Sequence, residues 1–181
     1  MAVRFYVAHG ASGSSASMRG HVEGLRKRGI DAVAIDLPVK KAEDVVGTYR
    51  TIVPDRTTAR GPVITVGGQS YGGRVSTLAA AEDGTEYAGI VCFSYPLHPP
   101  GKPDQAVART SHWPRIRCPV LLLSGEADPF ARIELLRAAV PLLREAELHT
   151  YPRLGHSLKP VLDDALDRAA AFLQGVAGTP S

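Results

Sequence analysis

The chain has 181 residues, a length that fits one domain and leaves little for a second. Apolar residues make up 44% of it and charged residues 22%, which excludes a wholly disordered chain. The net charge of +3 is too small to indicate nucleic-acid binding, and apolar runs such as residues 120–123 are too short to cross a membrane. Residues 1–7 are too short and too soon interrupted to form a secretory signal, so we expect a cytoplasmic protein.

Short apolar runs typical of strands alternate with longer stretches in which apolar residues recur at helical spacing. The predicted strands are residues 3–8, 32–35, 62–66, 89–93, 120–123 and 147–151. The predicted helices are residues 14–29, 42–53, 71–81, 131–143 and 158–173. Residues 95–117 hold five prolines and little periodicity, which predicts a long loop with room for one helical turn. Residues 175–181 are rich in Gly, Pro and Ser, so we expect a frayed tail there.

This alternation predicts the fold class. Continuous apolar strands separated by helices indicate a mainly parallel sheet, here of about six strands, covered by helices on both faces. We therefore expect one domain over residues 1–181, a three-layer α/β/α sandwich. In such sheets the chemistry lies beyond the carboxyl ends of the strands, so the loops that follow the strands are the places to search.

One such loop carries a nucleophile pattern. Gly68-x-Ser70-x-Gly72 follows a predicted strand and opens a predicted helix. A sharp turn there would expose the Ser70 hydroxyl, and glycines on either side would let strand and helix approach closely. The helix N-terminus would favour negative charge developing at the site. The alternative is an ordinary glycine-rich turn between a strand and a helix.

A serine nucleophile needs a base and an orienting acid. His156 follows the last predicted strand in a Gly-His turn, where its ring could reach the nucleophile. Asp128 directly follows the most apolar strand and is the preferred acid, with Glu126 as its rival. Asp128 could instead cap the next helix. The chain order Ser70, Asp128, His156 is the nucleophile–acid–base order of one known fold.

The same chemistry needs two N–H groups to hold a developing oxyanion. One should be the backbone N–H of Tyr71, the residue after the nucleophile. The other should come from the loop after the first strand, where we expect Ala11, with Ser12 as the near alternative. His9 is expected to support this loop, which could also be a plain glycine-rich turn.

Four short motifs, taken together and in chain order, resemble those of α/β-hydrolases over nearly the whole chain. They are His9-Gly10, Gly68-x-Ser70-x-Gly72, Gly125-x-x-Asp128-Pro129-Phe130 and Gly155-His156. More narrowly, residues 70–74 and 95–103 resemble the small branch of testis-expressed and NSL-complex-subunit hydrolase-like proteins, near the dienelactone hydrolases. The resemblance implies that Ser70 is the nucleophile, Asp128 the acid and His156 the base.

Two departures limit what the resemblance implies. Dienelactone hydrolases use a cysteine nucleophile where this chain has Ser70, so a lactone substrate is not implied. The His9-Gly10 turn comes so early that the antiparallel hairpin which usually opens the fold is expected to be absent, as is a cap domain. The resemblance thus implies a minimal α/β-hydrolase fold, in a branch that also includes scaffold-like members.

The loop over residues 95–117 should run beside the site in place of a cap. Together with Ser12, the residues expected to touch substrate are Tyr95, Leu97, His98, His112 and Trp113. The alternative is a proline-stiffened loop that packs its aromatic side chains on the sheet edge. Cys92 and Cys118 show no disulfide or metal spacing and read as buried, reduced thiols.

Together these residues predict a serine hydrolase that forms an acyl-enzyme on Ser70. We expect a small carboxylic ester or thioester as substrate, since no cap shapes a large pocket. The chemistry requires neither a metal nor an organic cofactor. We expect a monomer or small homo-oligomer without a nucleic-acid or membrane partner. Two alternatives remain: a non-catalytic interaction module on the same fold, and a peptidase or amidase with the same residues.

Overall fold

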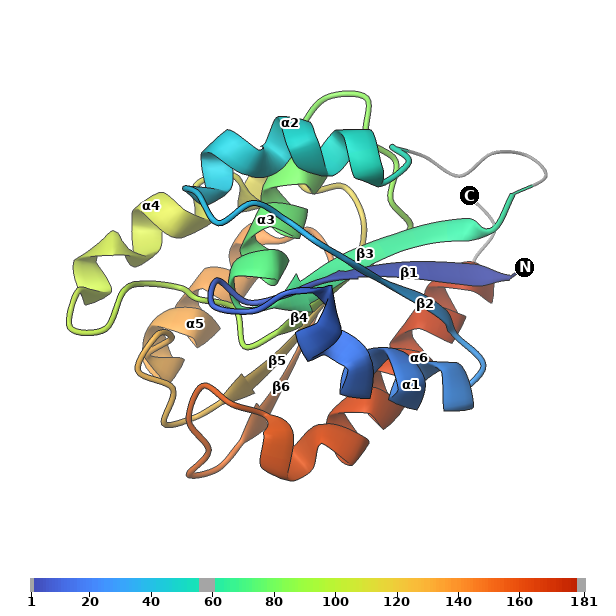
Figure 1. Ribbon diagram of the computed structural model, residues 1–181. Helices are drawn as coiled ribbons and strands as arrows, with labels where there is room; N and C mark the ends of the chain where they lie inside the picture. Colours follow the sequence, from blue (N-terminus) through green and yellow to red (C-terminus); the bar gives the residue numbers. More distant parts are fainter. Residues whose placement is uncertain (1, 56–60, 179–181) are drawn as a thin grey trace.

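The computed structural model describes residues 2–55 and 61–178 and contains one parallel sheet (Figure 1). Its strands are β1 (Val3–Ala8), β2 (Asp31–Ile35), β3 (Val63–Gln69), β4 (Ile90–Phe93), β5 (Val120–Gly125) and β6 (Ala146–Tyr151). They lie in the order β2-β1-β3-β4-β5-β6, and every neighbouring pair is parallel. The predicted sheet is confirmed. The chain moves outward from β1 to β2 and then returns to β3, which creates a topological switch point between β1 and β3.

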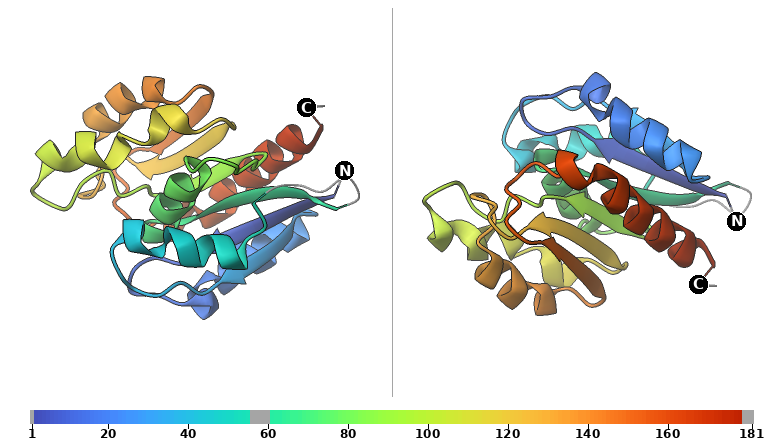
Figure 2. Two further views of the ribbon diagram at one scale, coloured as in Figure 1. Left: turned by 90° about the horizontal axis from the view of Figure 1, so that it is seen from above. Right: turned by 90° about the horizontal axis from the view of Figure 1, so that it is seen from below.

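Helices cover both faces of this sheet. They are α1 (Arg19–Lys27), α2 (Ala42–Ile52), α3 (Tyr71–Ala80), α4 (Ala106–Thr110), α5 (Ile133–Ala139) and α6 (Leu162–Gly178). Helices α1 and α6 cover one face, and α2, α3 and α5 cover the other (Figure 2). Their apolar side chains pack with those of the strands in two separate clusters, one on each face. The predicted three-layer sandwich is therefore confirmed. Among the described residues, no helix is both long and apolar enough to cross a membrane.

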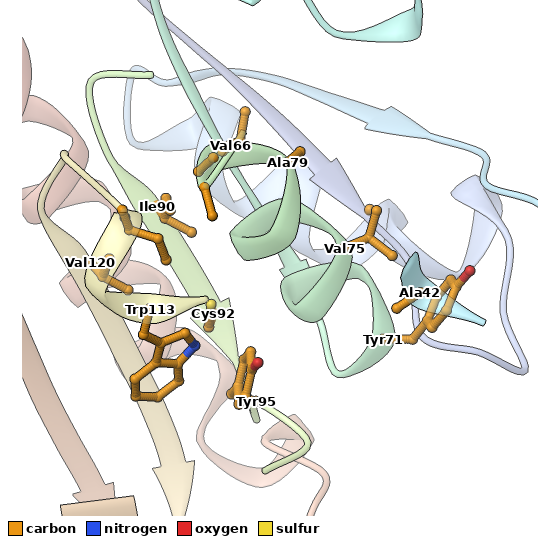
Figure 3. Close-up of a cluster of buried hydrophobic side chains, with 14 of the residues drawn as sticks. Ala42, Val66, Tyr71, Val75, Ala79, Ile90, Cys92, Tyr95, Trp113 and Val120 are labelled. Atoms are coloured by element: carbon orange, nitrogen blue, oxygen red, sulfur yellow. The ribbon is translucent and has the colours of Figure 1, made fainter. Parts of the chain in front are cut away.

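The central strands are buried on both faces, as their continuous apolar sequences require. Every residue of β4 and β5 is buried, and so is β3 up to Gly68. On the face that α3 covers, Val66 and Ile90 of the sheet belong to the same cluster as Val75 of α3 (Figure 3). Tyr95 and Trp113 extend this cluster beyond the end of β4.

The helix boundaries differ from the prediction at three places. The stretch predicted as a helix over 14–29 begins as a 3₁₀ turn, Ser15–Met18, before α1. The stretch predicted over 131–143 divides into α5 and a 3₁₀ turn, Val140–Leu142, because Pro141 has no N–H to donate to the preceding turn. Likewise, the turn Lys159–Val161 precedes α6.

The chain end also differs from the prediction. Residues 175–178, expected to be frayed, form the last part of α6, so that expectation is wrong there. The physical reason is packing, because Val176 and Ala177 lie against the apolar cluster on that face of the sheet. Residues 179–181 lie outside the described residues.

The long segment between β4 and β5 has more structure than one turn. It contains two 3₁₀ turns, Pro103–Gln105 and Trp113–Arg115, on either side of α4. Both turns place a proline in their first turn, where a missing N–H costs nothing. Two of the five prolines that argued against a helix, Pro103 and Pro114, therefore stand at the start of short 3₁₀ turns.

Candidate active site

The carboxyl ends of β3, β5 and β6 bring three distant side chains together. His156 Nε2 lies 2.8 Å from Ser70 Oγ, and His156 Nδ1 lies 2.7 Å from Asp128 Oδ2. Each of the three follows a different strand, and 86 residues separate Ser70 from His156. This hydroxyl–imidazole–carboxylate chain has the geometry by which an activated nucleophile is recognised.

Ser70 occupies a strained backbone position between β3 and α3. Its φ of 48° lies in the region that non-glycine residues rarely adopt. The turn is held by the Ser70 N–H, which donates to the Phe93 carbonyl at 2.8 Å, and by the Ser70 carbonyl, which accepts from the Arg74 N–H. The flanking glycines are needed here. A Cβ on Gly72 would lie 2.6 Å from the carbonyl carbon of Ala8, and one on Gly68 would collide with the same backbone.

Asp128 is better placed than Glu126 to orient the imidazole. The Asp128 side chain is fully buried, and its second oxygen, Oδ1, accepts the N–H of Phe130 at 2.8 Å. The carboxylate of Glu126 accepts instead from Thr150 at 2.7 Å and from Arg137 at 3.0 Å. Asp128 does not cap α5, whose N-cap residue is Arg132.

The His156 ring is positioned by two close loops. It is in ring contact with Phe130, with centroids 4.4 Å apart. The loop that carries it lies directly on Gly125, where a Cβ would lie 2.6 Å from the carbonyl carbon of Leu154. The N–H of Ala127 donates to the Leu154 carbonyl at 2.9 Å. The close packing of these loops keeps the imidazole over the sheet edge, with 23% of its side chain exposed.

Tyr71 and Ala11, the residues expected to supply the two N–H groups, both lie beside Ser70. Tyr71 is the first residue of α3, and the first N–H groups of a helix have no partner within it. The loop after β1 approaches the serine closely, since a Cβ on Gly10 would lie 4.0 Å from Ser70 Cβ. Ala11 and Tyr71 both line the groove at Ser70. Ser12 is exposed next to Ala11.

Two buried histidines hold the surrounding loops by the same arrangement. His9 Nδ1 donates to the Gly10 carbonyl at 2.7 Å, while His9 Nε2 accepts the Leu37 N–H at 3.0 Å. His98 Nδ1 donates to the Pro99 carbonyl at 2.8 Å, and His98 Nε2 accepts the Arg132 N–H at 3.0 Å. The first pair of bonds fits the role expected of His9. The second ties the segment after β4 to the loop that carries Asp128.

The structure places the expected substrate-contacting side chains of residues 95–117 in the interior. Tyr95, Leu97, His98, His112 and Trp113 are all no more than 4% exposed. The Tyr95 hydroxyl donates to the Arg109 carbonyl at 2.7 Å, and its ring packs edge-on against Trp113. His112 Nε2 lies 2.9 Å from Thr77 Oγ1. These contacts match the alternative of a loop that packs its aromatic side chains, because burying rings stabilises it more than exposing them.

Other residues line the groove that opens at Ser70. It has a volume of about 510 Å³, a size typical of small-molecule sites. Its lining residues include Lys40, Lys41, Glu43, Ser70, Tyr71, Arg74, Pro96, Gln105, Arg109 and Phe130. The sequence alone did not identify Lys40, Lys41, Glu43 or Arg109 as site residues. A signal existed for the lysines, because they follow β2 at the same edge of the sheet as Ser70.

Comparison with known proteins supplies the family. The model of the family described as "Alpha/beta hydrolase domain" matches residues 2–177. The chain belongs to this family. The superfamily expected from the four motifs is thereby confirmed, whereas the narrower testis-expressed branch stays a prediction.

The α/β-hydrolase domain also resembles individual proteins. It is 33% identical over 121 residues to "Acyl-protein thioesterase 1" of Mycosarcoma maydis, covering 62% of this chain and 48% of that protein. The chain thus spans about half the length of this curated relative. Its fold is similar to that of a monoacylglycerol lipase from Paleococcus ferrophilus, with a TM-score of 0.78 and 17% identity over 96% of this chain and 94% of that one. Its fold is also similar to that of a dienelactone hydrolase from Anabaena variabilis, with a TM-score of 0.72 and 23% identity over 96% of this chain and 86% of that one.

A second hollow of the hydrolase domain, of about 340 Å³, lies between α1 and the segment after His156. Gln69 and Ser157, the neighbours of Ser70 and His156 in the chain, help to line it. Its wall contains Ser94, a residue with a φ of 57° whose buried hydroxyl has no hydrogen-bond partner among the described residues. Burial lowers the pKa of His21, also in this wall, to about 4.

The two thiols of the hydrolase domain are free, and their pKa values are unsuited to nucleophilic chemistry. Cys92 is fully buried, and burial raises the pKa of its thiol far above the usual value. Burial also raises the pKa of Cys118, which is partly exposed, to about 12. Within residues 2–55 and 61–178, no three His, Cys, Asp or Glu side chains gather as metal ligands would.

Proposed function

We propose that this α/β-hydrolase domain cleaves small carboxylic esters or thioesters, with Ser70 as nucleophile, His156 as general base and Asp128 as orienting acid. The observation that carries the proposal is the bond of 2.8 Å between Ser70 Oγ and His156 Nε2, made at a strained turn. A hydroxyl and an imidazole in that relation, with a buried carboxylate behind the ring, favour proton transfer from the serine during attack.

The reaction proceeds in two steps. Ser70 Oγ attacks the substrate carbonyl carbon while His156 Nε2 takes the serine proton, and Asp128 stabilises the resulting imidazolium through Nδ1–H. The leaving alcohol or thiol departs with that proton, which leaves an acyl ester on Ser70. Water then enters, gives a proton to His156 and attacks the acyl carbon. The carboxylic acid leaves as the proton returns to Ser70 Oγ.

Backbone N–H groups next to Ser70 stabilise the negative charge that develops on the substrate carbonyl oxygen. The N–H groups of Tyr71 and Ala11 are the proposed donors, and the N-terminus of α3 adds the positive end of its dipole. Loss of one such donor typically costs about 3 kcal/mol of transition-state stabilisation. Because backbone donors cannot be removed by a side-chain change, the glycines around them are the sensitive positions.

The groove supports a compact substrate. Its volume of about 510 Å³ suits a small ester, and the segment between β4 and β5 packs down on the core. The name of the curated relative, an acyl-protein thioesterase, supports including thioesters in the proposed class. The motif over residues 95–103 supports placement in the testis-expressed branch near the dienelactone hydrolases.

A serine-reactive probe tests the proposal. We expect a fluorophosphonate to label the protein at Ser70 and the Ser70→Ala variant to resist labelling. Ser70→Ala and His156→Ala should each lose about 10⁶-fold in kcat on p-nitrophenyl esters of rising chain length. A matched p-nitroanilide separates an esterase from an amidase. A folded wild-type protein that neither reacts with the probe nor cleaves any ester would contradict the proposal and favour a non-catalytic interaction module.

A further inference from the structure

The groove at Ser70 has a strongly asymmetric charge. Four cationic side chains line it, from Lys40, Lys41, Arg74 and Arg109, against one carboxylate, that of Glu43. The lysines come from the segment between β2 and α2, whereas Arg74 lies on α3 and Arg109 on α4. Elements distant in the chain therefore converge to make the groove positive, next to the proposed nucleophile.

Arg74 is occupied by the protein itself. Its Nη2 forms an ion pair with Glu43 Oε1, and its Nη1 donates to the Arg109 carbonyl at 3.1 Å. Partial burial would raise the pKa of Glu43, but its own N–H and the guanidiniums of Arg74 and Arg109 outweigh that and hold it below the usual value. The single carboxylate of the groove is thus ionised and largely committed to Arg74.

Arg109, in contrast to Arg74, forms no ion pair with Glu43. Its Nη1 donates to the Pro96 carbonyl at 2.9 Å, which fixes the side chain at the groove wall. Burial and the positive charge of Arg74 lower the pKa of Arg109, which means that its surroundings disfavour the positive charge of its guanidinium. Arg109, Lys40 and Lys41 have no carboxylate within ion-pair distance in the described part of the chain. A half-buried guanidinium with no carboxylate at ion-pair distance is suited to bind an anionic ligand.

We propose that this groove takes esters that carry a second, anionic group such as a carboxylate, held by Arg109 with help from Lys40 and Lys41. The inference rests on the proposed esterase function and narrows its substrate class. A guanidinium fixed at the wall can donate two parallel hydrogen bonds to a carboxylate, while the exposed lysines supply charge without fixed geometry. Neutral esters of equal length would gain none of this.

Matched substrates test the proposal. The p-nitrophenyl hydrogen esters of adipic, pimelic and suberic acid place a carboxylate at increasing distance from the scissile carbonyl, and their methyl-capped counterparts are neutral. We expect kcat/KM to favour one free acid over its capped counterpart by about tenfold or more. Raising the ionic strength from about 0.05 M to about 1 M should reduce this preference, because the Debye length falls. A second pair, 4-carboxyphenyl acetate and its methyl ester, places the anion on the leaving group, and a preference there supports the same site.

Variants locate the effect. Arg109→Gln should reduce the preference for the anionic substrate several-fold. The doubly substituted Lys40→Gln, Lys41→Gln protein changes only exposed side chains and should reduce it without affecting folding. Arg144→Gln is the matched control, since Arg144 is exposed and lies before β6, at the opposite end of the sheet. Equal kcat/KM for the acid and its neutral counterpart in all four matched pairs, with neutral esters turned over, would overturn this inference alone. Absence of turnover on every ester and of probe labelling would instead overturn the proposed function.

Discussion

Replacing Asp128 by asparagine should disable the site through the tautomer of His156. The two oxygens of Asp128 have different partners: Oδ1 accepts the Phe130 N–H at 2.8 Å, and Oδ2 faces His156 Nδ1 at 2.7 Å. Asparagine has only one oxygen. The Phe130 N–H requires an acceptor, so that oxygen stays there and the amide NH₂ turns towards His156. Nδ1 must then accept, which places the imidazole proton on Nε2, opposite the Ser70 hydroxyl.

The position of the imidazole proton on Nε2 determines how much activity the Asp128→Asn variant loses. With Nε2 protonated, His156 has no lone pair to receive the proton of Ser70, so base catalysis is lost while the geometry remains. We expect kcat to fall by about 10⁴-fold, or about 5 kcal/mol in activation free energy. The free energy of unfolding should change little, because the asparagine still satisfies the Phe130 N–H and keeps the shape of the fully buried side chain.

The assay is p-nitrophenyl ester hydrolysis, together with thermal unfolding followed by circular dichroism. Glu126→Gln is the matched control. Its amide oxygen can still accept from Thr150, so we expect kcat within about threefold of wild type, as for other changes outside a site. If Asp128→Asn kept kcat within about tenfold of wild type while Glu126→Gln lost about 10⁴-fold, the acid would have to be Glu126 and the tautomer argument would fail.

Three further predictions concern packing and titration. Gly72→Ala should abolish probe labelling and lower the melting temperature, since its Cβ would meet the Ala8 backbone; unchanged labelling would contradict the elbow geometry. Burial lowers the pKa of His112 to about 4 from the model-peptide value of 6.5, so folding disfavours its protonation and stability should fall as pH drops through that window. Denaturant titrations at several pH values measure the free energy of unfolding. Between pH 6.5 and about 4, the His112→Gln protein should lose up to roughly 3 kcal/mol less of it than wild type, and identical pH profiles would refute this. Cys92 should react with a maleimide only after unfolding, and rapid labelling of the native thiol would show that it is not buried.

The elements that sequence reasoning located best are those whose signals are local. The run of apolar residues over 120–123 can be satisfied only in a strand buried on both faces, and β5 is such a strand. Ser70, Asp128 and His156 could be assembled in advance because all carboxyl ends of a parallel sheet lie at one edge. Strand order did not need to be known, only that the sheet is parallel.

The groove wall could not be located in the same way. Whether Tyr95 points outward or into the core depends on the packing of Trp113 and α3, which no local pattern encodes. Arg109 looks like a surface arginine in sequence, and only the approach of α4 to α3 makes it a neighbour of Arg74. Residues of long loops acquire their roles from tertiary contacts, so burial there can be decided only in three dimensions.

The position of β6 has a consequence for the durability of the site. This strand lies at the edge of the sheet, pairs with β5 alone, and keeps most of its side chains partly exposed. The loop that carries His156 begins where β6 ends, so the proposed base is attached to one of the least protected strands, whereas Ser70 is attached to one of the best protected. Partial openings of a protein start at such margins and cost less free energy than global unfolding. We therefore expect the lifetime of a competent site to depend on the margin of the sheet, where Glu126 accepts a hydrogen bond from Thr150 of β6 at 2.7 Å.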